Sequence, residues 1–358
     1  MIHSLGLARG RSFSTLLPGV LLAATLGASC GGGSSPTGPD PTPNPPPGTP
    51  VSAFVFYDEN ANGIADPLES IRLPGVTVTV GTGTGQTTAG GRAVVANVPS
   101  GTQMATAKPD SLPPYFTPGT PVPVQVPQAA GTEIAVPVTL PIGRNRPNVY
   151  MAFGDSITFG EGSNDGSGYR SYLEADLRSY WGGTPSLINE GMSATRSDKG
   201  AGRIGPALDR WRPAYTLILY GTNDWNDIEC RDERFPCYTI SSLRSMIQEA
   251  RSVQSQPILG TIIPVNPEYA DRDAVARNDW VRHMNDEIRA LARAERAAVA
   301  DLHAAYLRQP SLPALFRDFL HPNEQGYALM AQEFLRGITT PMSASSSRRS
   351  FFFSLGRS

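Results

Sequence analysis

Residues 151–158 read MAFGDSIT, and they lie where an apolar run ends and a glycine-rich loop follows. The apolar run NVYMAF (148–153) is typical of a short buried strand, and it stops at Gly154, Asp155 and Ser156. A serine at this point is either an ordinary turn residue, whose hydroxyl bonds nearby backbone, or a nucleophile. A serine nucleophile needs a base, a group that orients the base, and donors for an oxyanion. The rest of the sequence must therefore supply these groups.

Strand-like and helix-like segments alternate after this stretch. Helical spacing is present in 168–181, 240–254, 278–295 and 323–338, and short apolar runs fill 185–190, 215–221, 257–264 and 297–302. Such alternation predicts a parallel sheet with helices on both faces, an α/β fold arranged as a three-layer α/β/α sandwich. In sheets of this kind the site lies beyond the carboxyl ends of the strands. The informative residues are therefore those that directly follow each apolar run.

Polar or glycine-containing segments follow these strands. Gly191 lies in NEGMSATRS (189–197), Asn223 in GTNDW (221–225), and Asp318 and His321 in DFLHPNEQGY (318–327). Each segment is a weak signal alone, but their order after successive strands predicts that they meet Ser156 at one edge of the sheet.

The base is found by elimination among four histidines. His3 belongs to a predicted leader, and His283 lies in a charged helical segment. His303 follows a predicted strand but has no evident orienting partner. His321 follows Asp318 by three residues, so a carboxylate can bind one ring nitrogen while the other accepts the Ser156 proton. The alternative is that Asp318 and His321 only cap the last helix.

Candidate oxyanion donors follow from the same segments. Asn223 offers a side-chain amide, Gly191 can present its N–H because no side chain blocks close approach, and Ser156 has its own N–H. Asp155 and Asp224 are expected to position their loops rather than to react.

The segments FGDSIT, NEGMSATRS, GTND and DFLHPNEQGY resemble the conserved blocks of the SGNH hydrolases, also called GDSL esterases and lipases, over residues 148 to 338. The resemblance implies a flavodoxin-like fold, acyl-ester hydrolysis by Ser156, His321 and Asp318, and no cofactor for catalysis. The chain departs from the family at Phe319 and Leu320, where glycine is frequent, and in the segment 224–239.

The substrate remains open at this point. The sequence shows no long apolar lid, which favours short acyl groups such as acetyl esters of carbohydrates over lipid esters. A lysophospholipase or thioesterase of the same family, a non-catalytic cell-surface binding module, and a structural surface protein are the alternatives. A net charge of −2 without basic runs argues against a nucleic-acid partner.

A separate unit is predicted at 51–142, ahead of the hydrolase-like region at 146–338. Alternation in GVTVTV (75–80) is typical of a half-buried strand, and several further runs predict a small all-β sandwich. Between the first runs, DENANGIADPLE has the ligand order of a twelve-residue calcium loop, with a polar hairpin loop as the alternative. The predicted ligands are the side chains of Asp58, Asn60, Asn62, Asp66 and Glu69 and the carbonyl of Ile64.

Residues 51–107 also resemble the calcium-binding B-type repeats of bacterial surface adhesins, through FVFYDENANGIADPLE, LPGVTVTV and TTAGGRAVVANVPSGT. That resemblance implies a β-sandwich used as a stalk or spacer, with calcium as a structural ion.

The first residues predict export. Arg9 and Arg11 precede an apolar stretch at 16–28 that is too short to span a bilayer, as in a signal peptide. The sequence LGASC then resembles a lipoprotein signal, with 1–29 removed, Cys30 lipidated, and 30–50 serving as an extended tether. Ordinary cleavage is the alternative. We expect an extracytoplasmic cell-envelope lipoprotein, anchored to a membrane, with a C-terminal tail at 339–358 of unknown role.

Export also determines how the two remaining cysteines are interpreted. Cys230 and Cys237 have six residues between them, which suits a small disulfide loop in an oxidising compartment. A zinc site is the weaker alternative because no histidine or third thiol lies nearby.

Overall fold

The computed structural model describes residues 48–232 and 237–342, and the described residues belong to one compact unit. Cys30, the predicted leader, nearly all of the predicted tether and the tail beyond residue 342 lie outside these ranges. Across the described ranges, no helix combines the length and apolarity needed to cross a membrane.

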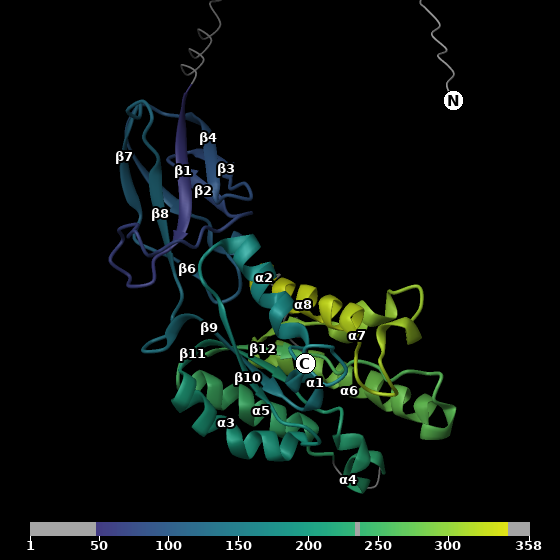
Figure 1. Cartoon of the computed structure of the whole chain (residues 1–358). Helices are drawn as coiled ribbons and strands as arrows, with labels where there is room; N and C mark the ends of the chain where they lie inside the picture. The colour runs from purple at the N-terminus through teal and green to yellow at the C-terminus, as the bar shows by residue number, and fades with distance from the viewer. Residues whose placement is uncertain (1–47, 233–236, 343–358) are drawn as a thin grey trace, which may run out of the picture. The chain divides into compact units, whose positions relative to one another are not determined.

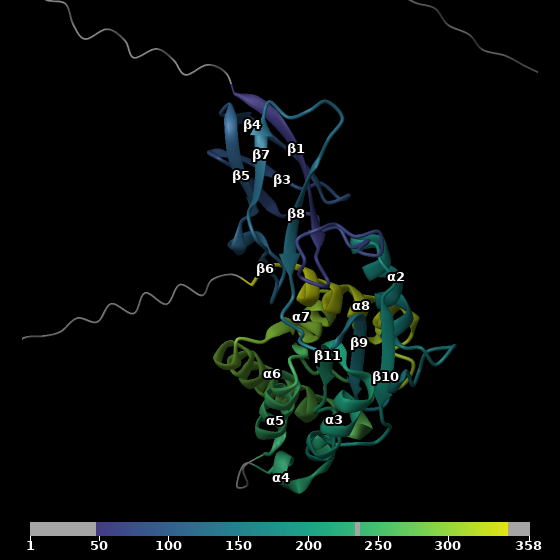
Figure 2. The same ribbon diagram turned by 90° about the vertical axis from the view of Figure 1, so that its left-hand side faces the viewer.

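The first part of the described chain is built from two antiparallel-rich sheets, which confirms a small β fold (Figures 1 and 2). One sheet has the order β4-β1-β8-β6 and the other the order β3-β2-β5-β7. A 3-10 helix, η1, spans Pro109–Ser111. The strands are β1 (Thr49–Tyr57), β2 (Thr77–Val80), β3 (Gly83–Gln86), β4 (Arg92–Val98), β5 (Gly101–Ala107), β6 (Thr117–Pro118), β7 (Val122–Val126) and β8 (Ile134–Thr139).

The second part is an α/β/α sandwich around a parallel sheet of order β10-β9-β11-β12-β13, as the alternation of segments predicts. Its strands are β9 (Arg146–Gly154), β10 (Ser186–Gly191), β11 (Pro213–Leu219), β12 (Gln256–Gly260) and β13 (Ala298–Ala300). Its α-helices are α1 (Ser156–Phe159), α2 (Tyr169–Trp181), α3 (Ser197–Trp211), α4 (Ile228–Arg231), α5 (Thr239–Ser252), α6 (Ala274–Glu295), α7 (Leu302–Leu307) and α8 (Glu324–Thr339). Its 3-10 helices are η2 (Asp224–Asn226), η3 (Ala270–Arg272) and η4 (Pro313–Leu315).

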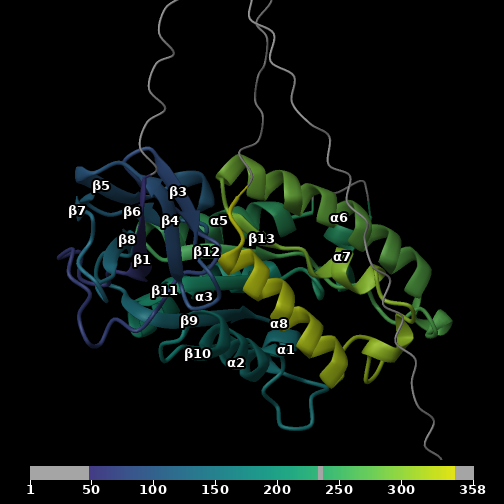
Figure 3. The ribbon, with the colours of Figure 1, turned by 90° about the horizontal axis from the view of Figure 1, so that it is seen from above.

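The central strand β9 shows how the layers form. Met151 and Phe153 belong to a buried cluster with apolar residues of α3, α5 and α6, whereas Tyr150 and Ala152 belong to a cluster with residues of α2 and α8. Alternate residues of a strand point to opposite faces, so a fully apolar strand buries both faces of the sheet. Helices α2 and α8 accordingly lie side by side on one face, and α3 and α5 on the other (Figures 1 and 3).

The register of the sheet brings the predicted site segments together. Gly154 at the end of β9 pairs with Gly191 at the end of β10 and with Leu219 at the end of β11. The loops after these three strands therefore leave the sheet at the same edge.

Helix α3 was not anticipated from the sequence. It contains Pro206 and several glycines, which are poor residues for a helix interior. Gly200 has a packing reason, because a Cβ atom there would lie 2.7 Å from the Tyr220 ring. The glycine thus allows α3 to pack closely against the end of β11.

The β part and the α/β part share one core. The Tyr115 hydroxyl donates to the Pro257 carbonyl at 2.6 Å and accepts the Ala298 N–H at 2.8 Å. Phe116 packs edge-on against Trp181 of α2, with ring centroids 5.8 Å apart. Buried residues of both parts form a single hydrophobic cluster, so we expect the two parts to support each other's stability.

Candidate active site

Ser156 is the first residue of α1, directly beyond β9. The Asp155 side chain caps this short helix by accepting the Ile157 N–H at 3.0 Å. Ser156 is 4% exposed. Its own N–H has no hydrogen-bond partner among the described residues, so this donor is free to bind an oxyanion.

The structure brings Ser156, His321 and Asp318 into one hydrogen-bonded chain. Ser156 Oγ lies 3.0 Å from His321 Nε2, and His321 Nδ1 lies 2.9 Å from Asp318 Oδ2. Asp318 Oδ1 accepts the backbone N–H groups of Leu320 and His321, each at 2.7 Å. Burial raises the pKa of Asp318, but these hydrogen bonds from His321 and Leu320 outweigh it and hold the pKa below its ordinary value. Asp318 therefore stays ionised as a partner for the imidazole.

The helix-capping alternative for this pair does not hold. Asn323 caps α8, since its side chain accepts the N–H groups of Gln325 and Gly326. His303 is buried on α7, and burial lowers its pKa. Among the described residues, only His321 is within hydrogen-bond distance of Ser156 Oγ.

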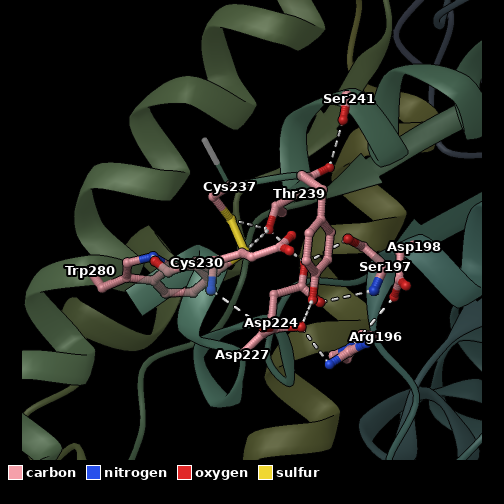
Figure 4. Close-up of a disulfide and its surroundings, with 12 residues drawn as sticks. Arg196, Ser197, Asp198, Asp224, Asp227, Cys230, Cys237, Thr239, Ser241 and Trp280 are labelled. Atoms are coloured by element: carbon pink, nitrogen blue, oxygen red, sulfur yellow. Dashed lines mark hydrogen bonds and ion pairs between the residues drawn. A yellow bond between two sulfur atoms is a disulfide. The ribbon is translucent and has the colours of Figure 1, made fainter. Parts of the chain in front are cut away.

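Asn223 follows β11, and its amide is already oriented. Asn223 Nδ2 donates one hydrogen to the Thr195 carbonyl at 3.0 Å, which leaves the second hydrogen of the same nitrogen available. Asp224 positions this loop, as expected. Asp224 Oδ2 accepts the hydroxyls of Ser197 and Thr239, each at 2.6 Å, and so ties the loop to the starts of α3 and α5 (Figure 4).

The predicted disulfide between Cys230 and Cys237 is confirmed. Figure 4 shows it next to Thr239, whose hydroxyl oxygen lies 3.1 Å from Cys237 Sγ. The Trp280 indole also donates to the Cys230 carbonyl at 2.8 Å. The disulfide thus fastens the segment after Asn223 close to the Asp224 hydrogen bonds.

Gly191 is not placed as a free donor. Its N–H donates to Asn189 Oδ1 at 2.9 Å, so it is not available to an oxyanion in this arrangement. The glycine serves packing instead, because a Cβ atom there would lie 2.2 Å from the Phe159 nitrogen.

The Ala194 N–H, unlike that of Gly191, is unpaired within the described residues. Ala194 has a φ of 57°, in the left-handed region. It lies directly before Thr195, whose carbonyl holds the Asn223 amide. An alanine gives no sequence signal for a free backbone donor, so nothing in the sequence singled this position out.

Arg277 is a second residue that the sequence did not reveal. It lies on α6, is 5% exposed, and donates from Nη2 to the Thr222 carbonyl at 2.5 Å. Its guanidinium also lies 5.5 Å from the centroid of the Phe319 ring. Burial lowers the pKa of Arg277 to about 10, with Asp155 opposing that shift. Arg277 therefore places a buried positive charge behind the peptide that carries Asn223.

Asp155 is the buried carboxyl behind the nucleophile. Its Oδ2 atom has no hydrogen-bond partner among the described residues, and burial raises its pKa to about 7. This carboxyl therefore titrates near neutral pH rather than serving as a permanent charge.

The predicted calcium-loop residues form a separate, local cluster between β1 and β2. Both Asp58 and Glu69 are 3% exposed. Asp58 accepts the N–H groups of Asn62 and Gly63 at 3.1 and 2.8 Å. Glu69 accepts the N–H groups of Glu59 and Asp66 at 2.9 and 3.1 Å. The two carboxylates thus satisfy backbone donors of their own loop.

The asparagines of this loop face Asp66. Asn60 and Asn62 donate from Nδ2 to Asp66 Oδ2 at 2.8 and 2.9 Å, while their Oδ1 atoms accept backbone N–H groups. The donor set is oxygen-rich, as calcium prefers. Across the described ranges, however, no group of three or more histidine, cysteine, aspartate or glutamate side chains is arranged to hold a metal ion.

Residues 152–329 match the profile of the GDSL-like lipase/acylhydrolase family. Similar solved structures include a lipase/acylhydrolase from Enterococcus faecalis, at 23% identity and a TM-score of 0.46, covering 55% of this chain and 99% of that one. Another is a variant of an acetyl xylan esterase from Geobacillus stearothermophilus, at 21% identity and a TM-score of 0.45, covering 56% and 99%. Comparison with curated proteins gives no significant match.

Proposed function

Residues 152–329 form a domain of the GDSL-like lipase/acylhydrolase family, and we propose on this premise that the protein is an exported serine esterase. Its substrates would be carboxylic esters of short acyl groups, such as acetyl esters of carbohydrates. The observation that carries the proposal is the chain of contacts from Ser156 Oγ through both ring nitrogens of His321 to Asp318.

In this mechanism Ser156 Oγ attacks the carbonyl carbon while His321 Nε2 takes its proton. Asp318 stabilises the imidazolium that forms. The C–O bond to the alcohol then breaks, the alcohol oxygen takes the proton from Nε2, and an acyl-serine remains. Water then attacks the acyl carbon while the same nitrogen takes one of its protons. The bond between the acyl carbon and Oγ breaks, Nε2 returns this proton to Ser156 Oγ, and the carboxylic acid leaves.

Negative charge develops on the carbonyl oxygen in both halves of the reaction. The free Ser156 and Ala194 N–H groups and the second hydrogen of Asn223 Nδ2 are the donors that we assign to it. Gly191 is left out because its N–H binds Asn189.

A panel of p-nitrophenyl esters from acetate to palmitate, with a lysophospholipid and an acyl thioester, tests the proposal. We expect turnover to fall steeply with acyl length. Preference for long chains would favour the lysophospholipase alternative, and preference for the thioester would favour a thioesterase. Absence of turnover would favour a binding module.

We also infer that the loop 58–69 binds one calcium ion. Support comes from the alternate spacing of its oxygen-bearing side chains and from Gly63, whose φ of 76° allows the tight turn. Calcium titration by calorimetry tests this.

The membrane anchor is a third proposal, and it rests on sequence alone. The apolar stretch before LGASC and the unpackable tether favour lipidation at Cys30. Cys30→Ser should release the protein from membranes, whereas a mature N-terminus elsewhere would exclude this anchor.

A further inference from the structure

Glu161 is a carboxylate at the catalytic base that the mechanism above does not use. It follows α1, and its Oε2 atom lies 3.2 Å from His321 Nε2. The same nitrogen lies 3.0 Å from Ser156 Oγ. Because Asp318 binds the other ring nitrogen, His321 has a carboxylate on both sides.

The position of Glu161 is fixed at both its backbone and its side chain. Its N–H donates to the Ser156 carbonyl at 3.0 Å, and its carbonyl accepts the Tyr327 hydroxyl at 2.5 Å. The Ser193 hydroxyl donates to Oε1. The side chain is nevertheless 40% exposed. The carboxylate is therefore held at the open side of the base.

The reaction brings the alcohol part of the ester close to Glu161. His321 Nε2 must hand its proton to the oxygen of the departing alcohol, so that oxygen must come within about 3 Å of Nε2. A group 3.2 Å from the same nitrogen then contacts the alcohol or its nearest substituents. A carboxylate accepts hydrogen bonds, cannot donate them, and repels anions.

We propose that Glu161 is a specificity-determining residue that selects the alcohol half of the ester. It favours esters whose alcohol carries a neighbouring hydroxyl group or a positive charge, and it disfavours esters of anionic alcohols. The inference rests on the proposed esterase function. Under it, Glu161 favours polyol esters over esters of phosphate-bearing lipids.

The test uses acetate esters that differ only in the alcohol: 2-hydroxyethyl, 2-methoxyethyl, choline and carboxymethyl. The shared acetyl group keeps the demands on Ser156 and the oxyanion donors comparable. For each ester, kcat/KM of Glu161→Ala and Glu161→Gln is divided by the wild-type value, which cancels the intrinsic reactivity of the alcohol. Glu174→Gln on α2 is the matched control, because Glu174 is paired among the described residues with exposed Arg178, away from His321.

We expect Glu161→Ala to lower kcat/KM for 2-hydroxyethyl acetate roughly tenfold more than for 2-methoxyethyl acetate, the order of a hydrogen bond to a charged group. The choline ester should lose and the carboxymethyl ester should gain relative rate in both variants. Glu161→Gln should keep part of the hydroxyl preference, because an amide oxygen still accepts. Ser193→Ala, which leaves the charge in place, should give the same pattern more weakly.

Equal loss for all esters in both Glu161 variants would overturn the inference, and so would an unchanged order. In either case, hydrolysis of p-nitrophenyl acetate that depends on Ser156 would leave the esterase proposal standing. If wild-type protein hydrolysed none of these esters and no fluorophosphonate labelled Ser156, both proposals would fall together.

Discussion

The Ser156–His321–Asp318 site and the loop 58–69 are both clusters of polar side chains with regular sequence spacing, but they are built differently. The contact between Ser156 and His321 joins residues 165 positions apart. Each hydrogen bond of Asp58 described above stays within five positions. Sheet topology therefore assembles the first cluster, and local turn geometry assembles the second.

The two clusters differ in how closely their side chains already match the proposed role. At the catalytic site the partners that a serine nucleophile needs already face one another. In the loop, two amide nitrogens face Asp66, where a cation would require oxygens. We therefore expect the first site to work without any added ion, and the second to rearrange its asparagines when an ion binds.

The largest effect should come from removing the nucleophile. Ser156→Ala should lower ester hydrolysis by about 10⁴-fold or more, because triad members act as a unit. Exposed Ser171→Ala on α2 is the control and should keep full activity. Activity of Ser156→Ala within tenfold of wild type, with an unchanged unfolding midpoint, would show that the assembled cluster is not the catalytic one.

A smaller loss is expected at the oxyanion. Asn223→Ala should lower kcat by about 10²–10³-fold with little change in KM, since its amide is assigned to the transition state. Steady-state kinetics on p-nitrophenyl acetate measure this. A rise in KM alone would instead place Asn223 in substrate binding.

The sequence predicted the sheet, its strand ends and the contacts of Ser156, His321 and Asp318. Apolar runs indicate the strands, and the ends of parallel strands meet at one edge of the sheet, so the segments that follow them come close together. It could not predict Ala194 or Arg277. The role assigned to Ala194 depends on a left-handed backbone conformation, which an alanine in the sequence does not indicate. The role of Arg277 depends on its burial and on its hydrogen bond to the Thr222 carbonyl. Gly191 is a different case, because close packing and an oxyanion role both favour glycine and the sequence does not distinguish them.

Asp155, directly before the catalytic serine, should make the stability of the fold depend on pH. Its folded-state pKa is raised by burial from 3.8 to about 7. Its stabilising contribution is therefore complete below about pH 4 and is lost as the pH rises through about 7. Asp155→Asn keeps a capping side chain and removes this dependence.

Urea unfolding at several pH values measures the effect. The free energy of unfolding of Asp155→Asn minus that of wild type should increase from pH 4.5 to pH 8, on the order of 3 kcal/mol. A difference that stays constant over this range would mean that Asp155 is not a buried titrating group.

The smallest effect should come from calcium, and it tests whether the loop is independent of the catalytic site. With an affinity on the order of 10⁻⁴ M, about 1 mM calcium should stabilise the folded chain by about 1.4 kcal/mol. Because Tyr115 bonds to both Pro257 and Ala298, this stabilisation should raise the midpoint of one shared unfolding transition.

Asp58→Asn should abolish the calcium-induced shift, whereas the exposed control Asp110→Asn should keep it. EDTA should lower the midpoint yet leave esterase activity unchanged at temperatures where the protein stays folded, since no residue of the loop belongs to the triad. Loss of activity in the folded, EDTA-treated protein would place the ion at the catalytic site and remove the distinction between the two clusters.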